Sequence, residues 1–276
     1  LTFAITFGLG AAVLLFRPQF EAVFGPIGPL LVSWPYYVGV SAPTISAVLL
    51  SAVFGGLEGV KNLLRGLVRR VQLRWVIFAL LTYPTGLLVW GLVERGLFGN
   101  GASASINIHA ILVSAPLILF TTANILIDPG PWGEEAGWRG FALQRLLTRC
   151  SPLTAAIILG VIWGVWHAPA FFASGLTQSG THFGWFLVAV VCISILMTWI
   201  YMNANRNFLV AGFIPHAINN LMGTSHAVMD VKIQALVLSV IAALIIIASG
   251  SGLKGCRFAR SRRSILGWSR PEDPSE

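Results

Sequence analysis

Charged residues are scarce in this chain. Only 10% of its 276 residues are Asp, Glu, Lys or Arg, whereas 56% are hydrophobic and the mean hydropathy is +0.79. Several apolar runs approach the roughly 20 residues that cross a hydrocarbon core of about 30 Å. These runs are continuous, whereas the strands of a membrane barrel alternate apolar and polar residues. The composition therefore predicts a helical membrane protein and argues against a barrel.

Cysteine is also rare. Cys150, Cys192 and Cys256 are widely separated and follow neither a Cys-x-x-Cys pattern nor a disulfide framework, so we assign them no role. The chain starts at Leu1 rather than at a methionine, and its apolar first segment has no basic region before it. This favours a membrane span over a cleaved signal peptide.

The apolar segments predict an all-α, polytopic membrane helix bundle of about eight transmembrane helices. We expect spans at residues 1–16, 36–56, 75–94, 108–128, 152–173, 183–202, 208–226 and 231–249. Nothing marks a separate soluble domain, so residues 1–253 form one predicted transmembrane domain. Residues 254–276 are basic and then rich in proline and acid, which predicts a disordered cytoplasmic tail. Kinks rather than breaks are expected at the prolines inside spans, which are Pro43, Pro84, Pro116, Pro169 and Pro215.

The basic residues are distributed unevenly between the two predicted sides of the membrane. Of the 18 Lys and Arg residues, only Arg17, Arg95 and Lys232 fall on one side. The richer side should be cytoplasmic and should hold both termini, as in a bacterial inner or plasma membrane. Membrane topology thus explains the formal charge of +8, so lipid is an expected partner and nucleic acid is not. Residues 57–74 mix basic and apolar residues, which suits either a helix at the lipid headgroups or an ordinary connecting loop.

Residues 133–140, with the sequence GEEAGWRG, place two carboxylates and a guanidinium in this apolar chain. Ionised groups inside a membrane are costly and usually mark a functional site. Glu135 and Arg139 are four residues apart and should pair on one helix face, whereas Glu134 is rotated by about 100° and should be free. Pro131 predicts that the helix begins here, where its dipole favours negative charge. The alternative is an interfacial helix whose glutamates face water.

Histidine follows on the next predicted helix. If residues 134–148 and 153–172 form two antiparallel helices that turn at Ser151, then Glu135 and His167 each lie 16 residues from the turn. The two side chains should therefore be level. A lone histidine in a span more often bonds a backbone carbonyl, but the neighbouring carboxylates favour a functional role.

A third polar set lies near the expected kink at Pro215. His216 and Asn220 are four residues apart and point the same way from their helix, whereas Asn219 is turned away. The alternative is a polar contact that holds helices together. A carboxylate in an apolar pocket can activate water, an imidazole can position it, and an asparagine can donate to an oxyanion. One carboxylate and two imidazoles also suit zinc, so Glu134, His167 and His216 form a possible metal set. The residues leave metal-free and metal-bound water equally open.

The order Glu-Glu-x-x-x-Arg, aromatic-x-x-x-His and His-x-x-x-Asn resembles the CPBP family, which comprises CAAX proteases and bacteriocin-processing intramembrane proteases and is also called Abi. The resemblance covers residues 129–223. It implies an eight-helix membrane endopeptidase with a cavity open to the cytoplasmic side, and both metal-dependent and glutamate-dependent mechanisms have been described. Trp163 stands where the second motif usually has Phe. By matching position, the resemblance implies catalytic roles for Glu134, Glu135, His167, His216 and Asn220, with Arg139 and Trp163 in support.

These observations predict an intramembrane endopeptidase that cleaves a membrane-associated or lipidated peptide. One branch of the family cuts prenylated CAAX ends. We expect the site to lie below the cytoplasmic surface, with Trp138 and Trp166 bordering a substrate groove. The alternative is a non-catalytic membrane protein that binds a partner or confers immunity to a toxin. A proton-coupled transporter is less favoured, because no second half of the chain repeats the Glu-Glu segment.

Overall fold

The computed structural model describes residues 1–16, 18–19, 22, 34–98, 128–172, 177–224 and 230–254. All regular secondary structure in these ranges is helical, which confirms the all-α prediction. The expected span at 108–128, apart from Asp128, and the expected tail beyond Lys254 lie outside the described residues. The predicted count of eight helices therefore stays a prediction.

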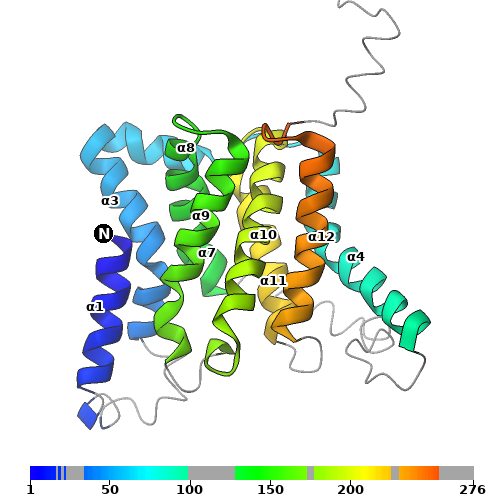
Figure 1. Ribbon diagram of the computed structural model, residues 1–276. Coiled ribbons are helices and arrows are strands. Elements are labelled where there is room, and N and C mark those ends of the chain that lie inside the picture. The colour runs from blue at the N-terminus through cyan, green and yellow to red at the C-terminus, as the bar shows by residue number, and fades with distance from the viewer. Residues whose placement is uncertain are drawn as a thin grey trace, which may run out of the picture.

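Seven expected spans correspond to helices, which stand side by side in Figure 1. Their bounds are Thr2–Leu15 (α1), Trp34–Arg65 (α3), Leu73–Phe98 (α4), Pro152–Trp166 (α9), Phe183–Asn203 (α10), Ile214–Thr224 (α11) and Val231–Ser249 (α12). By length and composition, α3, α4, α10 and α12 can each cross a membrane, and α1 and α9 contain shorter apolar segments. The chain is thus an integral membrane protein.

Helix α10 packs between α9 and α12 near the middle of the bundle. Two glycines of α9, four residues apart, bring the α9 and α10 backbones together. A Cβ atom added to Gly160 would lie 2.7 Å from the Cα of Val191, and one on Gly164 would lie 2.5 Å from Leu187 Cδ1. Small residues at this spacing allow close helix packing in membranes.

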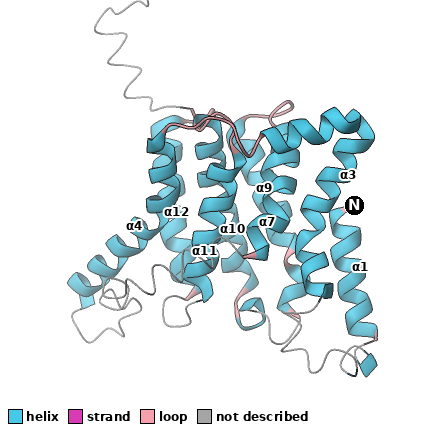
Figure 2. Cartoon of the chain, turned by 180° about the vertical axis from the view of Figure 1, so that it is seen from behind, coloured by secondary structure: helices cyan, strands magenta, loops and turns pink. Residues whose placement is uncertain are grey.

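The loops at one end of the bundle are hydrogen-bonded to one another and to neighbouring helix ends. Leu153 N donates to Ser251 O at 3.0 Å, and Phe208 N donates to Gly66 O at 3.1 Å. Asn207 Nδ2 donates to Arg69 O at 2.7 Å. We call this the basic end. It consists of residues 66–72, 147–151, 204–208 and 250–254, which Figure 2 draws together at one end of the bundle. The hydrogen bonds between these connections join segments that are far apart in sequence.

Helix α3 changes direction at Gly56, whose φ of 57° is a conformation that favours glycine. Beyond this residue, the helix runs across the basic end (Figure 1). Leu57 is 71% exposed, whereas Leu63 is buried. Residues 57–74 were predicted to be either a helix at the lipid headgroups or a connecting loop. They are helical as far as Arg65, and the position of this helix at the headgroups stays a prediction.

One predicted span is too long. Helix α9 ends at Trp166, and residues Ala168–Phe171 form a short 3-10 helix, whereas the span was expected to reach 173. Pro169 has no backbone N–H, and its ring would clash with the preceding turn of an α-helix. It therefore ends the helix here, although Pro43 and Pro84 lie inside α3 and α4 as expected.

Candidate active site

The site is built on a helical segment that begins earlier than predicted. The segment consists of Pro129–Glu135 (α7), a π-helical stretch Ala136–Ala142 (η3) and Leu143–Leu146 (α8). Asp128 caps it, because its Oδ1 accepts from Gly130 N at 2.9 Å, and the proline that follows suits the first helical position. The expected start near Pro131 is therefore wrong, and Glu134 lies in the second turn rather than at the helix terminus.

Close contact with α3 fixes the position of this segment. A Cβ atom on Gly133 would lie 2.7 Å from Val40 O, and one on Gly137 would lie 2.5 Å from backbone atoms of Pro43. Thr44 Oγ1 also donates to Trp132 O at 3.1 Å. The two glycines are four residues apart, so the helices meet backbone to backbone and hold the two glutamates inside the bundle.

Glu135 is bonded from two other parts of the site. Its Oε1 accepts from the guanidinium of Arg139 at 2.9 Å and lies 2.8 Å from His216 Nδ1. All three residues are at most 3% exposed. An ionised carboxylate only accepts hydrogen bonds, so Nδ1 of His216 carries the hydrogen and Nε2 is left for another partner. The predicted pairing of Glu135 with Arg139 is confirmed.

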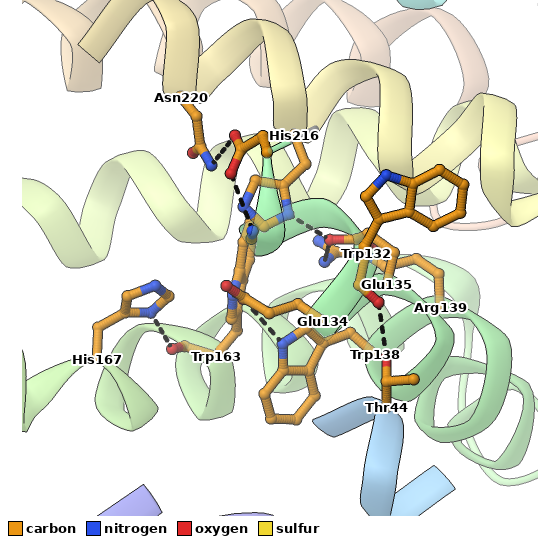
Figure 3. Close-up of polar contacts among 12 residues, drawn as sticks. Thr44, Trp132, Glu134, Glu135, Trp138, Arg139, Trp163, His167, His216 and Asn220 are labelled. Carbon is orange, nitrogen blue, oxygen red and sulfur yellow. Dashed lines mark hydrogen bonds and ion pairs between the residues drawn. The ribbon is translucent and has the colours of Figure 1, made fainter. Parts of the chain in front are cut away.

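Glu134 is held rather than free (Figure 3). Its Oε2 accepts from Trp163 Nε1 at 2.6 Å and from Trp138 Nε1 at 3.3 Å, and the residue is 3% exposed. Trp138 lies four residues further along the same helical segment and so shares its face. The expectation of a free carboxylate was wrong because it did not include the two indole donors.

His167 caps the end of α9 and touches the site through tryptophan. Its Nδ1 lies 2.9 Å from Trp163 O, and because a carbonyl only accepts, Nδ1 is the donor and Nε2 is the acceptor of the neutral ring. The ring packs edge-on against Trp166 and Phe186. Glu134 contacts Trp163, which precedes His167 by one turn of α9. That Glu135 and His167 are level stays a prediction. Within the described residues, no hydrogen bond joins His167 to Glu134 directly.

The third polar set converges beside Gly130. A Cβ atom there would lie 2.9 Å from Asn220 Nδ2 and 3.6 Å from His216 Nε2. Asn220 Nδ2 also donates to Asp128 Oδ2 at 2.9 Å, which joins α11 to the cap of α7. Asn219 instead accepts a bond from Gln234 of α12, so the expectation that it turns away is confirmed. Two nitrogens of the predicted set thus face one small region.

The predicted metal set is Glu134, His167 and His216. Among the described residues, no group of three His, Cys, Asp or Glu side chains is arranged to hold a metal ion. In the expected set, Glu134 Oε2 is bonded to indoles and the Nδ1 atoms of His167 and His216 are bonded to oxygens. The Nδ1 bonds leave Nε2 of each histidine for another partner, as in histidines that bind zinc, so a metal at Glu134, His167 and His216 stays a prediction and the reaction proposed for the site is written with these side chains alone.

Comparison with known proteins identifies the same segment. The family model described as type II CAAX prenyl endopeptidase Rce1-like matches residues 114–222, which include Glu134, Glu135, His167, His216 and Asn220. Over these residues the chain is similar to this family. The CAAX prenyl protease 2 of Methanococcus maripaludis is 26% identical over 266 residues, which cover 89% of this chain and 90% of that protein. Similarity to a family of membrane endopeptidases agrees with the apolar helices and with the buried carboxylates.

Sequence reasoning missed two contributors to the site. Asp128 was expected at the end of a span, yet it caps α7 and binds Asn220. An Asp directly before Pro-Gly-Pro is a helix-start signal that could have shown this. Trp138 was expected to border a groove, and its spacing of four from Glu134 could have suggested the hydrogen bond.

Proposed function

We propose that this chain is an endopeptidase that hydrolyses a peptide bond inside the membrane bundle, with Glu134 as the general base. The observation that carries the proposal is the buried carboxylate of Glu134, which lies beside the Glu135–His216 pair in the segment matched by the family model. A carboxylate in a water-poor, apolar site is suited to accept a proton from water.

In the proposed reaction each side chain of the site has one role. Glu134 takes a proton from water while the water oxygen attacks the carbonyl carbon, and Nε2 of His167 accepts a hydrogen bond from the O–H that stays on that oxygen. Asn220 donates to the oxyanion, and His216 donates from Nε2 in its imidazolium form, with Nδ1 bonded to Glu135; this agrees with the convergence of their nitrogens beside Gly130. When the C–N bond breaks, Glu134 returns its proton to the leaving amine, and the products are a carboxylic acid and an amine.

The proposed substrate is a membrane-associated or lipidated peptide. Because helices of the bundle are long and apolar enough to cross a membrane, we expect the substrate to be anchored in the same bilayer. The relative from Methanococcus maripaludis is named a CAAX prenyl protease, which makes a prenylated CAAX peptide the first substrate to test. A bacterial inner or plasma membrane stays the predicted location.

The test is cleavage of a fluorogenic prenylated peptide by the purified full-length protein in lipid nanodiscs. We expect Glu134→Gln to lower kcat by about 10²–10⁴-fold and His167→Ala to lower it as well. Asn220→Ala should lower kcat by about 10²–10³-fold with little change in KM, as expected for the loss of an oxyanion donor. The matched controls are Glu58→Gln and His182→Ala, which change exposed residues away from the site.

Two outcomes would change the proposal. Equal activity in the wild type and in all three site variants would contradict hydrolysis by these residues and favour the partner-binding alternative. Loss of wild-type activity in chelator, followed by recovery when zinc is added, would show that a metal takes part and would replace the metal-free reaction. Full activity in chelator would agree with the reaction above.

A further inference from the structure

One tryptophan contacts four charged or imidazole groups of the candidate site, which are Glu134, Arg139, His167 and His216. The indole N–H of Trp163 donates to Glu134, and its ring lies 4.3 Å from the guanidinium carbon of Arg139. The ring also packs edge-on against His216, with centroids 5.1 Å apart, and the backbone carbonyl accepts from His167. Figure 3 shows Trp163 between His167 and Glu134.

We propose that Trp163 is a positioning residue, which orients the Glu134 carboxylate through its indole N–H and so fixes which oxygen meets the water. This inference rests on the proposed function of Glu134. The bond of 2.6 Å is short, as expected when the acceptor is charged, and both partners are buried. With Oε2 held by Trp163 and by the longer bond from Trp138, Oε1 is the oxygen presented to water.

The proposed role of Trp163 depends on its indole N–H. The motif that Trp163 matches usually has Phe, which supplies the same ring face to Arg139 but has no N–H to donate. Trp163→Phe is therefore a narrow test, because it removes the donor and keeps an aromatic ring beside Arg139 and His216. Trp75→Phe is the matched control, since Trp75 is a buried tryptophan of α4 that packs against Trp199 and Phe78, outside the site.

The experiment compares kcat and KM of the full-length protein in nanodiscs, with the fluorogenic peptide as substrate. We expect Trp163→Phe to lower kcat by about 10- to 100-fold with KM within about twofold, which is the size expected for a hydrogen bond to a charged group. Trp138→Phe should lower kcat less, because its bond is longer. Trp75→Phe should keep both constants. An unchanged kcat in Trp163→Phe, or a rise in KM alone, would overturn the inference.

Glu134→Gln, measured beside these variants, separates the two proposals. If Glu134→Gln is inactive and Trp163→Phe keeps full kcat, only the positioning role fails. If Glu134→Gln keeps full activity, the proposed function itself fails. A second measurement does not need turnover. The ¹⁵N-indole resonance of Trp163, assigned by its loss in Trp163→Phe, should move in Glu134→Gln, and an unmoved resonance would contradict the bond to the carboxylate.

Discussion

At the scale of single residues, Arg139 shows what the buried charges cost and what offsets that cost. Its side chain is fully buried, with the guanidinium bonded to Glu135 and lying over the ring of Trp163. Two charges removed from water are tolerated only when they pair closely, so neither partner can be lost without leaving the other unpaired. Glu135 therefore has a structural role whether or not it takes part in the reaction.

Glu135→Ala should lower the free energy of unfolding by roughly 3–5 kcal/mol, because it leaves both Arg139 and His216 without their buried partner. Glu58→Ala is the control. Its ion pair with Lys61 is exposed, and such pairs contribute about 0–1 kcal/mol. Both values can be measured by denaturant unfolding in mixed micelles. Equal losses for the two variants would show that the buried pair adds no more than a surface pair.

Local spacing predicted some of these contacts and could not predict others. The bond from Glu135 to Arg139 follows from a separation of four residues on one helix. The bond from Trp163 to Glu134 joins residues 29 apart, and that from Asn220 to Asp128 joins residues 92 apart. Such contacts depend on how helices pack, and one sequence does not determine the direction in which an indole N–H points.

At the scale of elements, glycines set how closely α7 and η3 approach α3. Gly133 and Gly137 face the backbone of Val40 to Pro43, and a backbone cannot move aside as a flexible side chain can. Glu134 and Glu135 lie between these two glycines in the sequence. The distance between the two helices therefore also positions the carboxylates.

Gly137→Ala should therefore push this segment away from α3. We expect a loss of about 1–3 kcal/mol in stability, as for other overpacked sites, and a lower kcat because Glu134 moves with its helix. Gly8→Ala in α1 is the matched control, because an added Cβ there meets nothing within 4 Å. Thermal unfolding and peptide cleavage can be measured on the same samples. A fully active and fully stable Gly137→Ala would show that the close approach is not needed.

The existence of the helices was easier to predict than their ends. Long apolar runs specify spans because a bilayer needs about 20 apolar residues, and α10 and α12 agree with their predictions to within a residue. The ends of the helices depend on single capping or helix-breaking residues, which the apolar pattern does not include. Asp128 moves the start of α7 upstream, and Pro169 ends α9 before the apolar run is complete.

At the scale of the whole molecule, basic residues are concentrated at one end of the bundle, the basic end. Arg69, Arg70, Arg149, Arg206 and Lys254 all lie on its connections, and Arg145 lies in the last turn of α8 beside them. Figure 1 shows α8 at this end and α7 further into the bundle, so the candidate site lies below the surface that carries the positive charge. The redirected part of α3 adds Lys61 and Arg65 to the same end.

Because cytoplasmic loops of membrane proteins carry an excess of Lys and Arg, we expect the basic end to face the cytoplasm. Single cysteines placed in a background without Cys150, Cys192 and Cys256 can test this with a membrane-impermeant maleimide on intact cells. Ser179→Cys, in the connection between α9 and α10 at the opposite end, should be labelled from outside. Thr148→Cys, which is exposed at the basic end, should react only after the cells are opened. Labelling of Glu134→Cys but not of Thr148→Cys from outside would show that the site opens away from the cytoplasm.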